Sequence, residues 1–165
     1  MIAIVDYGAG NLTSVKRALA YLGIRSRIVL TGEELRSACA DQTTRIIFPG
    51  VGHARAAMVT LRDRELDGAL REAFRLRTPM LGICLGAQVV LSHSEEGDTP
   101  CLDLILGSCP KFRLPDKSLK VPHMGWNEIA VTQPHPVLRG VEPGDEFYFV
   151  HSYYPLPHDP AHVLA

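Results

Sequence analysis

Short β-branched runs alternate with helix-length amphipathic segments through the first half of the chain, and this alternation constrains the fold more than any other feature. The runs that predict strands are Ile2–Val5, Ile28–Leu30, Arg45–Phe48 and Pro79–Ile83. Between them, apolar residues recur at steps of three and four, as on one face of a helix. Strands and helices that alternate in this way predict an open parallel α/β sheet covered by helices on both faces.

Local signals mark where several of these elements begin and end. Gly23 follows an amphipathic segment that starts at Leu12, and Thr31–Glu34 has the spacing of a capping box. The segment 54–77 predicts a helix that Asp67–Gly68 could divide in two. Beyond Ser94 the chain carries turn residues and short strand patterns, which predicts a β-rich second half with strands at 121–131 and 147–150.

Composition excludes several classes of partner and cofactor. The 165 residues suit one domain, and 17 Lys plus Arg against 18 Asp plus Glu give a net charge of −1, so we expect no nucleic acid and no membrane partner. The four cysteines form no Cys-x-x-Cys pair, which favours free thiols in the cytoplasm and no metal site. Gly8-Ala-Gly10 lacks the third glycine of a dinucleotide loop, because residue 13 is threonine, so we expect no cofactor.

Gly82-Ile-Cys84-Leu-Gly86 stands where a predicted buried strand meets a helix, which is the arrangement of a nucleophile elbow. A sharp turn there would strain the backbone at Cys84, and side chains at the two glycine positions would collide with the neighbouring strand and helix. The first N–H groups of the helix, beginning with that of Leu85, would face a developing oxyanion. The alternative interpretation is a buried cysteine in a glycine-rich turn.

Pro49-Gly-Val-Gly52 ends the neighbouring predicted strand and could donate a second N–H to the same oxyanion, or it could be only a tight turn. A thiol nucleophile usually needs a histidine base. His93 lies nine residues after Cys84, so along one helix its imidazole would start roughly 13 Å away, too far to reach the sulfur. His123 and His151 flank predicted strands and could approach the site, or could be ordinary loop histidines.

Five motifs, in order along nearly the whole chain, resemble the class I glutamine amidotransferases, and among them the glutaminase subunits of imidazole glycerol phosphate synthase. They are Asp6–Leu12, Pro49–His53, Gly82–Gln88, Pro122–Asn127 and Phe149–Tyr153. The Pro-His-Met-Gly-Trp-Asn segment separates these subunits from other class I amidotransferases. The resemblance implies a flavodoxin-like fold and one amidotransferase domain over residues 1–165.

The resemblance also implies a reaction and a partner. Cys84 would attack the side-chain amide of glutamine, form a γ-glutamyl thioester and release ammonia. A (β/α)8 cyclase subunit would receive the ammonia and make imidazole glycerol phosphate and aminoimidazole carboxamide ribotide, a step of histidine biosynthesis. By motif matching, Gly50, Val51 and Gly52 form the oxyanion strand, Gln88, Ser152 and Tyr153 line the glutamine pocket, and Trp126, Asn127 and Tyr148 face the partner.

Two departures from the family pattern affect the expected activity. Family members continue beyond the segment that matches His162–Ala165 into strands, a His-Pro-Glu motif and a closing helix, so we expect a C-terminally truncated and nearly inactive subunit. Ala87 stands where methionine is commoner in this elbow. The alternatives are a noncatalytic partner-binding subunit of the same fold, and a cysteine hydrolase of another flavodoxin-like group with His123 or His151 as base.

Overall fold

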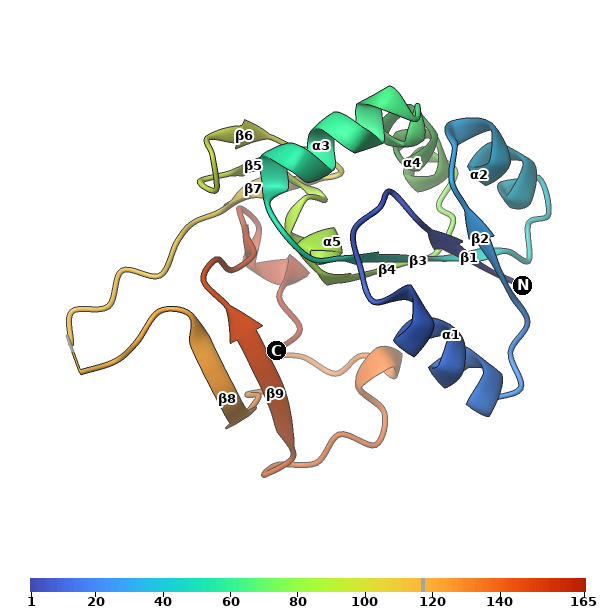
Figure 1. Cartoon of the computed structure of the whole chain (residues 1–165). Coiled ribbons are helices and arrows are strands. Elements are labelled where there is room, and N and C mark those ends of the chain that lie inside the picture. Colours follow the sequence, from blue (N-terminus) through green and yellow to red (C-terminus); the bar gives the residue numbers. More distant parts are fainter. Residues whose placement is uncertain (117) are drawn as a thin grey trace.

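A parallel four-stranded sheet organises the first half of the protein (Figure 1). The computed structural model describes residues 1–116 and 118–165. The sheet has the order β2-β1-β3-β4, and its strands are β1 (Ile2–Val5), β2 (Ser26–Val29), β3 (Arg45–Gly50) and β4 (Met80–Cys84). Because all three pairings are parallel, the carboxyl ends of the strands lie along one edge, where loops and helix starts can build a site.

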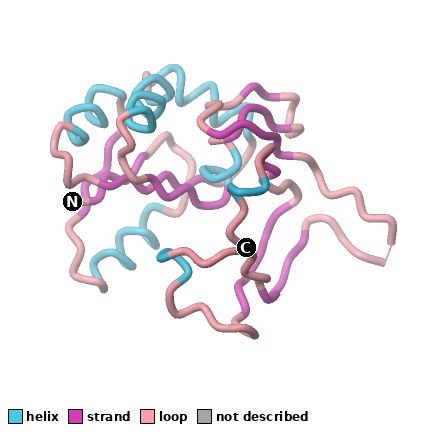
Figure 2. The backbone as a smooth tube through the Cα atoms, turned by 180° about the vertical axis from the view of Figure 1, so that it is seen from behind, coloured by secondary structure: helices cyan, strands magenta, loops and turns pink. Residues whose placement is uncertain are grey.

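Helices cover both faces of this sheet, so the predicted α/β architecture is confirmed. Helix α1 (Leu12–Tyr21) lies on one face, and α2 (Gly32–Cys39), α3 (Ala54–Asp63) and α4 (Leu66–Arg75) lie on the other (Figure 2).

The segment 54–77 does divide in two, but the predicted position of the break was wrong. It falls at Arg64–Glu65, because Gly32 at the start of α2 packs against the Glu65 carbonyl and its N–H donates to the Arg64 oxygen at 2.8 Å.

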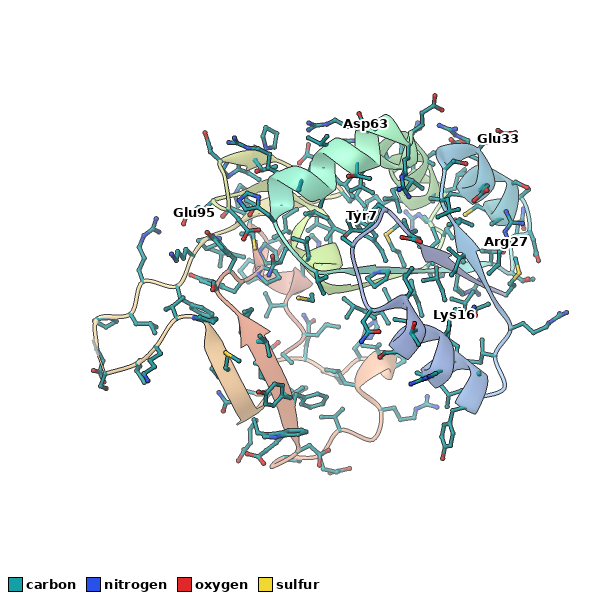
Figure 3. The ribbon with its side chains drawn as sticks, in the orientation of Figure 1. Tyr7, Lys16, Arg27, Glu33, Asp63 and Glu95 are labelled. Atoms are coloured by element: carbon teal, nitrogen blue, oxygen red, sulfur yellow. The ribbon has the colours of Figure 1, made fainter. Side chains whose placement is uncertain are left out.

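The main core lies between the sheet and helices α2 to α4. Its largest fully buried side chains include Phe48 from β3, and Met58, Leu61 and Leu70 from the helices. Figure 3 shows Tyr7 inside this layer, whereas Glu33 and Asp63 lie on the outer surfaces of their helices. The Thr31 hydroxyl caps α2 by accepting from the Glu34 N–H at 3.2 Å, and the Glu34 carboxylate accepts from the Leu30 N–H at 2.7 Å.

The opposite face of the sheet is covered less completely. Leu19 is the one buried residue of α1, and Leu81 and Ile83 of β4 remain 52% and 39% exposed. The prediction of a fully buried strand at 79–83 was therefore wrong. The physical reason is position, because β4 is the last strand in the described sheet and α1 lies over other strands.

The second half is built from β structure, as the sequence predicted. After the short helix α5 (Leu85–Gln88), a mixed sheet has the order β10-β7-β5-β6, with strands β5 (Leu91–Ser94), β6 (Thr99–Pro100), β7 (Ile105–Cys109) and β10 (Leu156–Pro157). A separate antiparallel hairpin pairs β8 (His123–Glu128) with β9 (Glu146–His151). Two 3-10 turns, η1 (Pro136–Leu138) and η2 (Pro160–His162), complete the described elements. Figures 1 and 2 show the hairpin on the same side of the parallel sheet as α1.

Candidate active site

Cys84 occupies a strained turn between β4 and α5. Its φ is 54° and its ψ is −118°, a conformation that a residue with a side chain rarely adopts, and the residue is exposed. A Cβ at Gly86 would overlap the Phe48 carbonyl oxygen, and one at Gly82 would lie 2.8 Å from the Ala87 Cα. The predicted steric role of the two glycines is thereby confirmed: they let the strand, the turn and the helix approach closely enough to hold Cys84 in this conformation.

Helix α5 is shorter than the sequence suggested, and this changes the position of His93. The helix ends at Gln88, and Val89–Leu91 pairs with the segment 102–105, so that the Leu102 N–H donates to the Val89 oxygen at 2.9 Å. His93 therefore lies in β5, and the prediction that it shares a helix with Cys84 was wrong. Its Nε2 lies 2.9 Å from the Asp98 carboxylate, so this nitrogen pairs with Asp98 and not with the Cys84 thiol.

The end of β3 lies directly beside the elbow. Gly50 is the register partner of Cys84, and a Cβ at Gly50 would overlap the Tyr7 hydroxyl and lie 3.0 Å from the Gly86 nitrogen. Gly52, two residues later, has a φ of 100°. Glycine at residue 50 therefore permits the close packing of Tyr7, β3 and the elbow, and the chain leaves β3 next to the thiol.

A cavity of about 380 Å³ opens above Cys84. Of the residues predicted from the sequence, it brings together Cys84, Val51, Gly52, Leu85, Gln88, Ser152 and Tyr153. Gly50 is buried beside it and is not part of its lining. The cavity is also lined by Glu96, Pro122, Val150 and His151. A volume of this size suits a small polar metabolite.

Glu96 is the one lining residue of this cavity that lies outside the five sequence motifs, and sequence reasoning missed it. It lies in the polar turn between β5 and β6, and its Oε2 accepts from the Ala54 N–H at the start of α3 at 2.7 Å. Nothing in the local pattern of the turn distinguishes Glu96 from its neighbour Glu95. Only the packing of the β5–β6 turn against α3 brings this carboxylate to the cavity.

Neither candidate base on the hairpin contacts the Cys84 thiol. His151 borders the cavity, but its Nδ1 lies 3.0 Å from the Tyr153 carbonyl oxygen and its Nε2 lies 3.3 Å from His123 Nδ1. A carbonyl only accepts, so Nδ1 carries the hydrogen and Nε2 of the neutral ring accepts from His123. Both nitrogens of His151 are thus engaged, and among the described residues no hydrogen bond joins an imidazole to the Cys84 sulfur.

The other three thiols differ from Cys84 in their surroundings. Cys101 and Cys109 are buried, and burial raises the pKa of Cys101 to about 11 and that of Cys109 to about 12. Cys39 is partly buried, and burial raises its pKa as well. Cys84 is the one cysteine that is exposed, and it lines the cavity at the end of β3 and β4.

Comparison with known proteins identifies the family. The family model described as "Glutamine amidotransferase class-I" matches residues 3–162. The chain belongs to the class-I glutamine amidotransferases. It is 47% identical over 162 residues to "Imidazole glycerol phosphate synthase subunit HisH" of Nitratidesulfovibrio vulgaris (strain DP4), an alignment that covers 95% of this chain and 74% of that protein. The HisH subunit of Dehalococcoides mccartyi (strain ATCC BAA-2266 / KCTC 15142 / 195) is 44% identical over 166 residues, covering 100% and 77%.

A solved structure agrees with this amidotransferase assignment at the level of the fold. The structure titled "Crystal structure of glutamine amidotransferase" superposes with a TM-score of 0.66 at 17% sequence identity, covering 96% of this chain and 75% of that one. The resemblance to the glutaminase subunits of imidazole glycerol phosphate synthase is therefore confirmed by the curated relatives, and the class-I fold by the superposition.

The residues predicted to face a partner lie apart from the amidotransferase cavity, on the β8–β9 hairpin. Trp126 and Tyr148 are 65% and 53% exposed, and their rings pack edge to face with centroids 5.4 Å apart. Asn127, the next residue along β8, is exposed as well.

Within the residues that the structure describes, no helix is long and apolar enough to cross a bilayer, and no three His, Cys, Asp or Glu side chains gather as a metal site would require.

Proposed function

We propose that this amidotransferase chain is the glutaminase subunit of an imidazole glycerol phosphate synthase and that Cys84 is its nucleophile. The thiolate sulfur would bond to the side-chain carbonyl carbon of glutamine, the carbon–nitrogen bond would break, and the nitrogen would leave as ammonia after taking up a proton. Water would then cleave the γ-glutamyl thioester and release glutamate. The observation that supports this most directly is an exposed cysteine, held in a strained turn, at a cavity of suitable size.

Backbone N–H groups on two sides of the cavity are the candidate oxyanion donors. Leu85 follows the nucleophile directly, and Val51 and Gly52 border the same cavity from the end of β3. An oxyanion formed at a carbonyl bound to Cys84 would lie between these two segments. Donors fixed by the backbone lose no side-chain freedom when charge develops, which suits transition-state stabilisation.

Side chains around the cavity suggest how free glutamine would be held. Glu96 supplies a carboxylate, and an amino-acid substrate carries an ammonium group that pairs with one. Gln88, Ser152 and Tyr153 add hydrogen-bonding groups. We therefore propose that Glu96 takes the α-ammonium of glutamine, with the other three residues orienting the rest of the molecule toward Cys84.

The β8–β9 hairpin is our proposed contact with the (β/α)8 cyclase subunit. An exposed tryptophan and tyrosine in contact are the kind of anchors on which protein interfaces concentrate their binding energy. Asn127 extends this face along β8. In this arrangement ammonia would pass from the cavity to the cyclase, in the cytoplasm, as a step of histidine biosynthesis. Residues 1–165 act in this proposal as one amidotransferase domain.

We further propose that these 165 residues by themselves turn over glutamine slowly. The support is local: among the described residues, both nitrogens of His151 are occupied and no imidazole contacts the Cys84 sulfur. Without a base the thiol is a weak nucleophile at neutral pH, and losing the base of a hydrolytic triad lowers turnover by on the order of 10⁶.

A glutamine-directed electrophile tests the site assignment. A diazo-ketone analogue of glutamine should attach to Cys84 slowly, because no imidazole contacts its sulfur, and to no other cysteine. Excess glutamine should slow this reaction further, because both molecules would occupy one cavity. Peptide mass spectrometry after labelling locates the adduct, and Cys84→Ala is the control. An adduct on Cys39, Cys101 or Cys109 would show that the nucleophile is assigned wrongly.

A further inference from the structure

A chain of hydrogen bonds connects the β8–β9 hairpin to the helix that follows the nucleophile. His123 Nδ1 lies 3.3 Å from His151 Nε2, and His151 Nδ1 lies 3.0 Å from the Tyr153 carbonyl oxygen. The same oxygen accepts from Gln88 Nε2 at 3.2 Å. Four residues from β8, β9, the segment after β9 and α5 are thereby linked.

The chemistry of the carbonyl fixes the direction of the two hydrogen bonds that meet at the Tyr153 oxygen. Because an oxygen of this kind only accepts, it must meet the amide nitrogen of Gln88 and the protonated Nδ1 of His151. The Gln88 amide is therefore held in one orientation, with its oxygen on the side away from Tyr153. In the neutral His151 ring, Nε2 has a lone pair and accepts from His123, which fixes the tautomer of that ring too.

Packing holds both imidazoles in the positions that these hydrogen bonds require. His123 and His151 are register partners across the hairpin, so a slip between the strands would separate them. The Phe112 ring meets His151 edge to face with centroids 4.9 Å apart, and the Phe149 ring stacks on His123 at 5.4 Å. Gln88 is only 8% exposed, so water competes little for its amide.

We infer that His123 and His151 are positioning residues: His151, supported by His123, holds the Tyr153 carbonyl in the place where it accepts from the Gln88 amide and so keeps that amide in one orientation. The result is a cavity wall that presents the amide oxygen of Gln88, an acceptor, to an N–H donor of the ligand. Neither histidine touches the reacting atoms. The identity of that ligand as glutamine rests on the proposed function, whereas the orientation of Gln88 does not.

Paired substitutions separate this role from a general structural one. His151→Phe and His123→Phe keep an aromatic ring in each position and remove the hydrogen bonds of the imidazole. His151→Asn and His123→Asn instead place an amide N–H close to the position of the imidazole Nδ1–H. His158→Phe is the matched control, because His158 is exposed and its side chain takes no part in the chain of bonds.

The first measurement is the solvent-exchange rate of the Gln88 side-chain NH₂, followed by nuclear magnetic resonance and assigned with Gln88→Leu. We expect the two phenylalanine variants to raise this rate about fivefold, the equivalent of one ordinary hydrogen bond, and the asparagine variants to stay close to the parent protein. Unchanged exchange in His151→Phe, or equal effects of phenylalanine and asparagine, would overturn the inference.

The second measurement is the labelling of Cys84 as a function of the concentration of the diazo-ketone analogue. The His123→Phe variant should raise the half-saturating concentration about fivefold and leave both the maximal rate and the rate with iodoacetamide unchanged, because His123 does not line the cavity. A loosened fold would instead change the iodoacetamide rate as well, which would count against positioning. If Gln88 exchange responds as expected but the parent protein shows no saturable labelling, the orientation of Gln88 stands and glutamine as the ligand fails.

Discussion

At the scale of single residues, the elbow can form because its glycines have no side chains. Gly86 has no side chain because the Phe48 carbonyl oxygen occupies the place where a Cβ would lie. Its backbone is not among those with positive φ, so its requirement is purely steric. Gly23, after α1, is the opposite case, with a φ of 68° and no atom within 4 Å of an added Cβ.

Gly86→Ala should lower the free energy of unfolding by about 3 kcal/mol, because either β3 or the elbow must move to accommodate the methyl group. Gly23→Ala, which meets only the cost of its backbone conformation, should lower it by about 1 kcal/mol. Urea unfolding of the two variants and the parent protein measures both values. Equal losses would mean that the packing against Phe48 is not what requires glycine at residue 86.

The buried thiols predict how stability depends on alkaline pH. The folded protein keeps Cys101 and Cys109 protonated up to a pH of about 11 and about 12, whereas in the unfolded chain a thiol ionises near pH 8.5. Above that pH the unfolded state binds fewer protons than the folded state, so stability should fall as pH rises through this range. In Cys101→Ala/Cys109→Ala, unfolding midpoints in urea should decline less steeply from pH 8.5 to 11; parallel curves would contradict this account.

At the scale of elements, the β8–β9 hairpin serves two surfaces at once. One end of it, at Val150 and His151, borders the cavity, while Trp126 and Tyr148 present aromatic rings to the outside. The antiparallel register that pairs Trp126 with Tyr148 also pairs His123 with His151. One short element therefore holds both the outer aromatic pair and the wall beside Gln88.

Trp126→Ala should weaken binding of the proposed cyclase partner by about 2 kcal/mol, roughly thirtyfold in the dissociation constant, and should lower folding stability by at most about 1 kcal/mol, the contribution of its contact with Tyr148. The reason is that the indole is already exposed in the isolated chain, so its removal leaves no cavity in a core. Titration calorimetry with the purified cyclase measures the effect. Tyr21→Ala on α1, where the side chain is 92% exposed, is the control and should bind as the parent protein does.

At the scale of the whole molecule, the sequence predicts the local elements better than the contacts between them. Glycine turns and helical spacing locate β1 to β4 and α1 to α4 to within a few residues, since these signals act over short distances. Helix α5 ends early because Val89–Leu91 pairs with residues 102–105. Strand β4 is exposed because it is the last strand of the described sheet. Glu96 and the Tyr153 carbonyl reach the cavity through tertiary packing, and a main-chain oxygen has no signature in the sequence.

The distribution of the four thiols makes this protein a convenient object for single-site chemistry. Two are enclosed and ionise only in strong alkali, a third is partly covered, and the fourth stands open at the mouth of the cavity. A maleimide dye at neutral pH should therefore couple first to Cys84 without any prior mutagenesis. Its fluorescence would report directly whether the space above residue 84 is filled or empty.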